Sequence, residues 1–445
     1  MAGESYVPAQ AVVEAPRAKV RLVYAGFGVP FALLILCFAA WGSAANLTDV
    51  LVGVFRHIFT MSNFQSALVQ FAYYGAYFAL AIPAAMINRR YGYKTGVLTG
   101  LGLATVGGVM FFPAAQLLSF APFLVALFVL AAGLSILETS ANPFAIAMGP
   151  EESATQRLNL AQAFNPVGAN IGVLLGAVLI LPNLTPEPAK VIMTPGQLEA
   201  SQERDLNLVL GPYIGIAAVL ALIWLLIALR GMTTPAERAE EETEATGGVF
   251  GRLWRNPHYR YGVAAQFFNV AAQVCVWSFT IQYALDVVGV PTEHAGWYLQ
   301  ASLLLFLVSR FVMTWLLGIF RPTLLLFLLA ALGVGLSLTA VFAENMVGLV
   351  AVVAISLSLS LMFPTIYGVA LQGLGEDTKF GAAGLVMAIL GGALLPPIQG
   401  IIMDRSGTAA AFIVPAVCLA FVALYALFDL RTKREGGPLV TEGAH

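Results

Sequence analysis

Residues 324–342 read LLLFLLAALGVGLSLTAVF, a run without one charged side chain. An α-helix rises about 1.5 Å per residue, so a run of this length crosses a hydrocarbon core of roughly 30 Å. Similar apolar runs recur along the chain, for example at 214–229 and 413–428, and only 10% of its 445 residues are charged. Soluble domains carry about a quarter charged residues, so the sequence predicts an integral membrane protein.

The length of the runs predicts helices, because membrane-spanning strands show segments of about ten residues with alternating hydrophobicity. Backbone groups in lipid must also be paired within their own segment, and a helix does this. The predicted fold is therefore all-α, with twelve transmembrane helices. We expect them near residues 24–54, 63–87, 95–113, 120–148, 158–182, 208–230, 259–286, 294–318, 322–342, 347–374, 380–404 and 408–429.

The sharpest polar break lies at 231–257 and contains an acidic run at 240–244. We interpret it as a cytoplasmic linker with a surface helix between two six-helix halves. The first eighteen residues lack the apolar core of a signal peptide, so the first helix is expected to insert uncleaved. The expected parts are an amino-terminal tail (1–22), an amino-terminal half (23–230), the linker (231–257), a carboxy-terminal half (258–430) and a tail (431–445).

Lysine and arginine are distributed unevenly between the two sides. If both termini are cytoplasmic, only Arg56, Lys190, Arg204 and Arg405 lie outside and Arg310 lies within a span, which leaves 17 of the 22 basic residues inside. Such a bias follows the positive-inside rule. We therefore predict two cytoplasmic termini.

The two halves repeat one feature, a proline inside the fourth and the tenth expected helix, Pro143 and Pro364. Proline frees a backbone carbonyl and permits bending. Matched prolines favour two halves that rock around a central site. Coincidence is the alternative, because proline is common in spanning helices.

Three charged residues, Asp49, Glu138 and Arg310, fall inside expected spans. Charges at this depth are costly and usually functional. Burial favours the neutral form of a carboxyl group, as a proton carrier requires, so we predict that Asp49 and Glu138 couple transport to protons. The alternatives are a structural ion pair, with Arg310 as the possible charge partner, or shallower positions.

Neutral polar side chains share helical faces with these acids. Amides offer donors and an acceptor to sugar hydroxyls, and the face of a tryptophan stacks on the apolar side of a sugar ring. Interhelical hydrogen bonding is the alternative for any single amide, but the stripes together favour a polar cavity. They contain Trp41 and Asn46, Glu138 and Asn142, Gln162 and Asn165, and Gln266, Asn269, Gln273 and Trp277, at spacings that bring them onto common faces.

Other motifs are scarce. No phosphate loop, metal-ligand cluster or nucleophile elbow occurs in the sequence, so we expect no catalytic residue, no metal and no ATP-driven pump. Cys37, Cys275 and Cys418 lie in apolar runs and are interpreted as buried small hydrophobes. Gly168, Gly172 and Gly176 recur every fourth residue, which predicts close helix packing.

Several longer motifs resemble the L-fucose:proton symporter family of the major facilitator superfamily, and the resemblance extends from about residue 23 to 428. The motifs that carry it are Trp41-Gly42 through Asn46 and Asp49, Asn63-Phe64-Gln65, Leu137-Glu138-Thr139 with Ala141-Asn142-Pro143-Phe144, Arg157-Leu158-Asn159-Leu160-Ala161-Gln162 with Phe164-Asn165, and Gly375 with Asp377-Thr378-Lys379.

The resemblance implies that Asp49 and Glu138 couple protons to sugar movement, and that Gln162, Asn165 and Asn46 line the sugar cavity. It also implies a bacterial inner membrane, a neutral monosaccharide substrate and protons as the coupling ion without another cofactor. We expect a monomer to be functional. No long basic run indicates a nucleic-acid partner.

The chain departs from the family pattern at two places. Asn269 stands where fucose transporters have tyrosine, and Met362-Phe363 stands where they have Gln-Tyr. Phe363 and Met362 are expected to form an apolar wall of the cavity. The sugar therefore stays open between L-fucose and a related neutral hexose, because glucose/galactose and N-acetylglucosamine transporters look closer at the tenth helix.

We predict sugar:proton symport by alternating access. A sodium-coupled or uncoupled carrier of glucose/galactose or N-acetylglucosamine is the nearest alternative. A membrane sugar sensor that transports nothing is a different class, but its output domain has no room in tails of about 20 and 15 residues.

Overall fold

The structure is a computed structural model that describes residues 21–58, 63–117, 120–180, 183–185, 193–232 and 248–432. Throughout these ranges the regular structure is helical. Eleven helices are long and apolar enough to cross a membrane, and one of them contains two crossings joined at Gly92. Gly92 has φ 81°, which a residue with a side chain rarely adopts. The expected fold of twelve spanning helices is confirmed.

The helices form two groups in chain order. The first comprises α1 (Gly28–Ile58), α2 (Asn63–Gln116), α3 (Phe120–Ala147), η1 (Glu151–Ser153), α4 (Ala154–Gln162), α5 (Phe164–Leu175), η2 (Gly176–Ile180) and α7 (Pro195–Ala228). The second comprises α9 (Val249–Arg255), α10 (Pro257–Asp286), α11 (Thr292–Leu316), α12 (Pro322–Phe342), α13 (Met346–Leu371), η4 (Gly375–Asp377), α14 (Thr378–Met387), η5 (Ala388–Leu390), α15 (Gly391–Ser406), η6 (Ala410–Phe412) and α16 (Ile413–Arg431).

Several boundaries differ from those expected. The two helices predicted at 63–87 and 95–113 are continuous in α2 apart from the turn at Gly92. α7 begins at Pro195 rather than at residue 208, because the Gln197 side chain accepts a hydrogen bond from the Thr194 backbone and caps the start. The helix predicted at 158–182 is interrupted at Ala163, where Pro166 cannot donate to the carbonyl four residues earlier.

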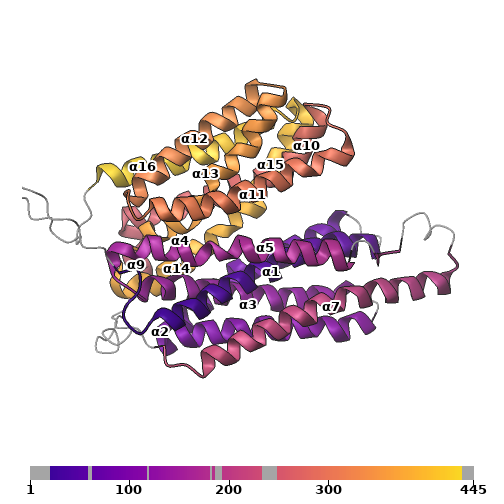
Figure 1. Cartoon of the computed structure of the whole chain (residues 1–445), viewed down its shortest axis with the longest axis horizontal. Helices are drawn as coiled ribbons and strands as arrows, with labels where there is room; N and C mark the ends of the chain where they lie inside the picture. The colour runs from indigo at the N-terminus through magenta and orange to yellow at the C-terminus, as the bar shows by residue number, and fades with distance from the viewer. Residues whose placement is uncertain are drawn as a thin grey trace, which may run out of the picture.

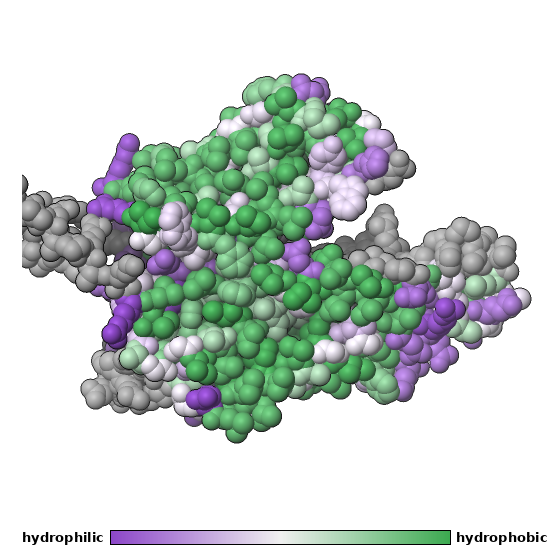
Figure 2. Space-filling model, in the orientation of Figure 1, coloured by the Kyte–Doolittle hydropathy of each residue, from purple (hydrophilic) through white to green (hydrophobic). Residues whose placement is uncertain are grey.

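The two groups pack as two bundles, which are seen one above the other in Figure 1. They meet near the end of the molecule that carries both described termini, where α2 and α3 contact α14, and α4 contacts α11 and α13. Toward the other end the bundles separate. Figure 2 shows hydrophobic residues over the flanks of both bundles and hydrophilic ones gathered at the ends, as a membrane requires.

Close approach of α1 and α5 positions the polar face of α1. A Cβ added at Gly168 would overlap the Ala39 backbone, and one at Gly172 would overlap the Ser43 carbonyl. The predicted glycine packing is therefore confirmed at these two positions, while the side-chain surroundings of Gly176 lie outside the described part. The three cysteines are buried and free, as expected.

We predict that Gly168→Val prevents normal assembly of the amino-terminal bundle. The added atoms have no space against α1, and overpacking of this kind costs about 1–3 kcal/mol or more. Gly215→Val in α7 is the matched control, because no atom lies within 4 Å of a Cβ there. Folded yield and melting temperature in detergent should fall for Gly168→Val and hold for Gly215→Val; equal values would contradict the packing role.

Candidate functional site

Glu138 lies in the middle of α3 and is fully buried. Its carboxyl group lies beside the amide of Asn142, one turn further along the helix. Neither carboxyl oxygen makes a hydrogen bond of normal geometry within the described residues. Burying a carboxylate without donors is expensive, and protonation removes that cost. Glu138 therefore has the surroundings of a group that exchanges a proton.

The neighbouring amides are fixed by each other. Gln162 Nε2 donates to Asn142 Oδ1 over 2.7 Å, which joins α4 to α3. The Asn142 Nδ2 group is buried and has no partner in the described part of the structure. Leaving a buried donor unsatisfied costs about 1–3 kcal/mol. A hydroxyl ligand at this point would relieve that cost, so the Glu138–Asn142–Gln162 cluster has the chemistry of a sugar site.

Arg310 on α11 is buried, with 4% of its surface exposed, and it binds backbone carbonyls from both bundles. Its Nε donates to the Ser360 carbonyl over 2.9 Å and its Nη1 to the Gln162 carbonyl over 3.4 Å. These are the carbonyls four residues before Pro364 and Pro166, which cannot donate to them. The prolines thus create the acceptors that satisfy the buried guanidinium.

This arrangement bears on the expected ion pair. Across the described residues Arg310 contacts carbonyl groups and the face of Phe306, and it forms no pair with a carboxylate. Glu138 has no cationic partner there either. Asp49 lies in α1, but its side chain is outside the described part, so its expected role stays a prediction.

Pro143 in α3 likewise leaves the carbonyl four residues earlier without its helical hydrogen bond. The carbonyl four residues before Pro143 is that of Thr139, and it accepts a hydrogen bond from Asn88 Nδ2 over 3.3 Å. Asn88 Oδ1 in turn accepts from Ser140 Oγ over 2.8 Å. Pro143 and Pro364, the pair predicted to match between the halves, both lie inside their helices and both leave a carbonyl for a buried side chain.

A tyrosine pair on α2 belongs to the site and was not predicted from the sequence. Trp41 Nε1 donates to the Tyr77 hydroxyl over 2.9 Å, and the Tyr73 hydroxyl lies 3.4 Å from it. Tyr77 also contacts α3, because its backbone carbonyl accepts from Ser135 Oγ over 3.1 Å. The four-residue spacing of Tyr73 and Tyr77 was the available signal, since it places both on one helical face.

The stripe on α10 faces α13. Trp277 Nε1 donates to Ser356 Oγ over 3.1 Å, and its ring packs edge-on against Phe306 at 5.0 Å. Gln273 and Trp277 are half-buried. Asn269 and Gln266 are fully buried, and their amide atoms have no partner among the described residues. The carboxy-terminal half therefore contributes unpaired donors and acceptors to the interior as well.

The remaining predicted residues differ in position. Asn46 Nδ2 donates to the Gly42 carbonyl over 3.0 Å and Asn165 Nδ2 to the Phe38 carbonyl over 3.5 Å, and both side chains are half-buried. Phe363 is half-buried and stacks near Tyr367 at 6.2 Å. Met362 is fully buried in the core of its own bundle. Phe363 and Met362 therefore lie in different surroundings, and the apolar wall expected from both stays a prediction.

Cross-bundle contacts close the end that carries the termini. Asn159 Nδ2 donates to Thr365 Oγ1 over 3.2 Å, and Lys379 lies 5.5 Å from the centre of the Tyr93 ring. The linker helix α9 joins this end through Arg252, whose Nη2 lies 2.6 Å from Asp377 Oδ1. That hydrogen bond raises the pKa of the Arg252 guanidinium. These contacts hold the two bundles together at the end that carries the termini.

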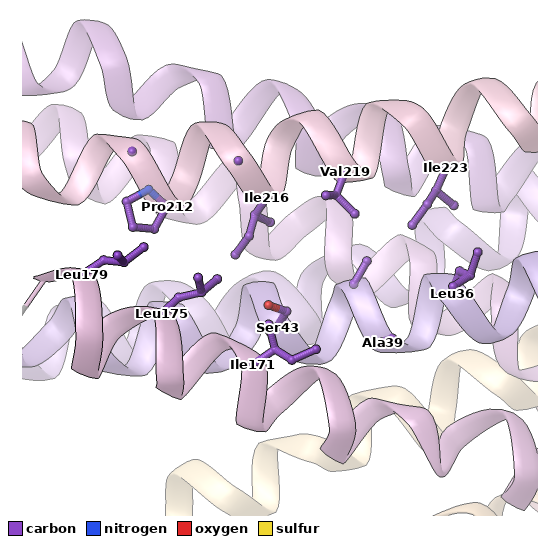
Figure 3. Close-up of a pocket in the computed structure, with 13 residues that line it drawn as sticks. Leu36, Ala39, Ser43, Ile171, Leu175, Leu179, Pro212, Ile216, Val219 and Ile223 are labelled. Atoms are coloured by element: carbon purple, nitrogen blue, oxygen red, sulfur yellow. The ribbon is translucent and has the colours of Figure 1, made fainter.

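A separate apolar groove of about 510 Å³ lies between α1, α5 and α7. Figure 3 shows that its lining side chains are aliphatic apart from Ser43. Leu36, Ile171 and Val219 in its walls are each about half exposed, on the flank of the amino-terminal bundle. With no charged or amide group in its lining, the groove lacks what sugar or proton binding needs.

Comparison with known proteins agrees with this architecture. Residues 31–389 match the model of the Major Facilitator Superfamily. The chain is 40% identical to the L-fucose-proton symporter of Escherichia coli (strain K12), over 91% of this chain and 94% of that protein. It is 33% identical to the glucose/galactose transporter of Brucella abortus biovar 1 (strain 9-941), over 91% of this chain and 95% of that protein.

Solved structures show the same arrangement. A crystal structure of FucP, a major facilitator superfamily transporter in the outward conformation, superposes with a TM-score of 0.86 at 38% identity, over 91% of this chain and 100% of that one. The proton:xylose symporter XylE shares the fold, with a TM-score of 0.71 at 10% identity, over 89% of this chain and 94% of that one.

Two bundles around a buried polar cluster define a membrane transporter of the two-halves type. The chain belongs to the Major Facilitator Superfamily and, within it, to the family of the L-fucose-proton symporters.

We predict that Arg310→Met weakens closure at the terminus-bearing end. One charge-assisted hydrogen bond contributes about 1.5–3 kcal/mol, so losing both should speed opening by about tenfold or more. The measurement is labelling of Thr155→Cys, which faces Gly368 across the bundles, by a bulky hydrophilic maleimide in a cysteine-free background. Arg405→Met, an exposed arginine at the other end, serves as control. Equal labelling rates in all three proteins would contradict a closing role for Arg310.

Proposed function

We propose that the chain is a secondary active transporter that carries L-fucose or a related neutral hexose together with a proton, by alternating access. The observation that carries this proposal is the environment of Glu138. Its carboxyl group is fully buried, accepts no hydrogen bond of normal geometry within the described residues, and lies beside the Asn142–Gln162 amide pair. Relatives at 40% identity that are named L-fucose-proton symporters support it.

The geometry supports a simple order of events. Protonated Glu138 is neutral and tolerates its dry surroundings, while sugar hydroxyls bind the unpartnered Asn142 donor and the amides of α10. The bundles then rock so that the closed end opens. Release of sugar exposes Glu138 to water, where the proton leaves. With both termini cytoplasmic, as we propose, the present state opens outward.

The substrate should be uncharged and of monosaccharide size. Arg310 is buried and directs its Nε and Nη1 donors to two carbonyls, so these donors are not available to an anionic sugar. Phe363 presents an apolar surface where a hydroxyl partner is expected for fucose, and relatives named glucose/galactose transporters support a wider choice of hexoses. A functional monomer in a bacterial inner membrane completes the proposal.

Two alternatives differ in the driving ion and in transport itself. An uncoupled carrier would not need the buried carboxyl, a sodium-coupled carrier would need a sodium gradient, and a sensor would bind sugar without moving it. Uptake of labelled L-fucose, D-galactose, D-glucose and N-acetylglucosamine into proteoliposomes separates them. Accumulation driven by an imposed pH gradient, without sodium, is expected. Accumulation only with sodium, or binding without uptake, would overturn the proposal.

We predict that Glu138→Gln loses active accumulation but keeps counterflow of sugar for sugar. The amide resembles the protonated acid and cannot release a proton, so exchange continues while coupling ends. Both are measured in proteoliposomes with and without a pH gradient. Asp404→Asn is the control, because Asp404 is an exposed carboxyl at the end of α15. A Glu138→Gln protein that still concentrates sugar with unaltered pH dependence would remove Glu138 from coupling.

We predict that Gln162→Ala weakens sugar binding about fivefold or more without reducing folded yield. It removes the amide that orients Asn142, and one hydrogen bond contributes on the order of 1 kcal/mol. Gln399→Ala, which removes a buried amide from α15, is the matched control. Calorimetric titration with the transported sugar gives both affinities. Equal affinity in wild type and Gln162→Ala would leave Gln162 a purely structural role.

A further inference from the structure

The Tyr77 hydroxyl is the meeting point of two hydrogen bonds in the amino-terminal bundle. It accepts from Trp41 Nε1 at 2.9 Å, and the Tyr73 hydroxyl donates to it at 3.4 Å. Tyr77 itself is 3% exposed, whereas Trp41 and Tyr73 are half-buried. A buried hydroxyl is thus connected to two aromatic side chains that are more exposed than Tyr77 itself.

The same tyrosine lies against α3 at the level of Glu138. Ser135 Oγ, one turn before Glu138, donates to the Tyr77 backbone carbonyl over 3.1 Å. Tyr77 lies in the part of α2 that packs against α3, and both Tyr77 and Glu138 are buried there. The backbone contact therefore holds α2 at Tyr77 against α3, one turn from Glu138.

The hydrogen bonds around Tyr77 leave its own hydroxyl proton without an acceptor among the described residues. A tyrosine hydroxyl has one donor and accepts hydrogen bonds through its oxygen. Trp41 and Tyr73 occupy the oxygen of Tyr77 as donors, so the Tyr77 O–H must be directed elsewhere. Among the described groups near it, the Glu138 oxygens are buried acceptors that have no hydrogen bond.

We propose that Tyr77 is a positioning residue for proton coupling, which donates its hydroxyl proton to Glu138 when the carboxyl is deprotonated and is itself held by Trp41. This inference rests on the proposed function. A sugar stacked on Trp41 fixes the indole N–H, and the indole fixes the Tyr77 hydroxyl. Sugar binding thereby affects the Glu138 carboxyl through two hydrogen bonds, one from Trp41 to Tyr77 and one from Tyr77 to Glu138.

Other groups also face Glu138. Tyr367 approaches from α13 and interacts with it electrostatically. Asn142 lies on the same helix, and Arg310 on α11 is bound to the Gln162 and Ser360 carbonyls. Asp49 on α1 has a side chain outside the described part. Of these, Tyr77 is the one whose hydroxyl is oriented by a residue proposed to touch sugar.

The test is the pH dependence of sugar counterflow in proteoliposomes with equal pH on both sides. Counterflow proceeds with Glu138 protonated throughout, so the pH at which it falls by half reports loss of that proton. Tyr77→Phe keeps the ring and removes the donor that stabilises the carboxylate. The half-maximal pH should move upward by about one unit. Trp41→Phe should move it in the same direction by less.

Controls separate positioning from structure. Tyr213→Phe removes a buried tyrosine hydroxyl that packs against Phe111 on another helix, and it should leave the half-maximal pH unchanged. Glu138→Gln abolishes the dependence on this group, and adding Tyr77→Phe to it should change counterflow no further. A Tyr77→Phe effect that persists in the Glu138→Gln background would show that Tyr77 acts by another route and would overturn the inference.

The remaining outcomes are also decisive. If Glu138→Gln uncouples transport but Tyr77→Phe and Trp41→Phe both keep the wild-type half-maximal pH, the inference fails and the proposed function stands. If Glu138→Gln itself still couples sugar to protons, the proposed function fails. Should Tyr77→Phe give no folded protein, Trp41→Phe tests the same hydrogen-bond chain from its other end.

Discussion

A buried guanidinium must be surrounded by acceptors, and this requirement organises the centre of the protein. Removing an arginine from water without compensation costs several kcal/mol. Arg310 meets the requirement through the Gln162 and Ser360 carbonyls, one from each bundle. Both are free because Pro166 and Pro364 lack an N–H. Since the two carbonyls come together only when the bundles are close at this level, solvation of one charge is tied to closure of one end.

Glu138 presents the opposite situation, because its carboxyl oxygens have no hydrogen bond in the described structure. A group that is satisfied, such as Arg310, resists change, whereas an unsatisfied acid responds to protons and to ligands that bring donors. The fixed charge therefore suits a structural role and the unpaired acid a coupling role. The Asn142–Gln162 hydrogen bond lies between these two residues and connects them through the Gln162 backbone.

Hydropathy and helical periodicity were sufficient to predict the twelve spans, the central position of Glu138 and the shared face of Gln273 and Trp277. They could not reveal partners, because a helical face does not specify what packs against it. Nothing in the sequence linked Arg310 to the carbonyls of Gln162 and Ser360, which lie 148 and 50 residues away along the chain. Nor could the sequence show that Met362 packs in the core of its own bundle while its neighbour Phe363 stays half-buried.

The location of each group in one bundle or the other determines what alternating access can change. Tyr77, Asn142 and Glu138 belong to the amino-terminal bundle, where glycine contacts hold α1 firmly against α5. Tyr367 and Arg310 belong to the other bundle. When the bundles rock as bodies, Glu138 keeps Tyr77 and Asn142 but changes its distance from Tyr367 and from the α10 amides. A proton can bias that equilibrium only by differing in free energy between the two states, so the carboxy-terminal bundle must supply the difference. Coupling in this protein is therefore a property of the interface between bundles, even though its acid resides entirely in one of them.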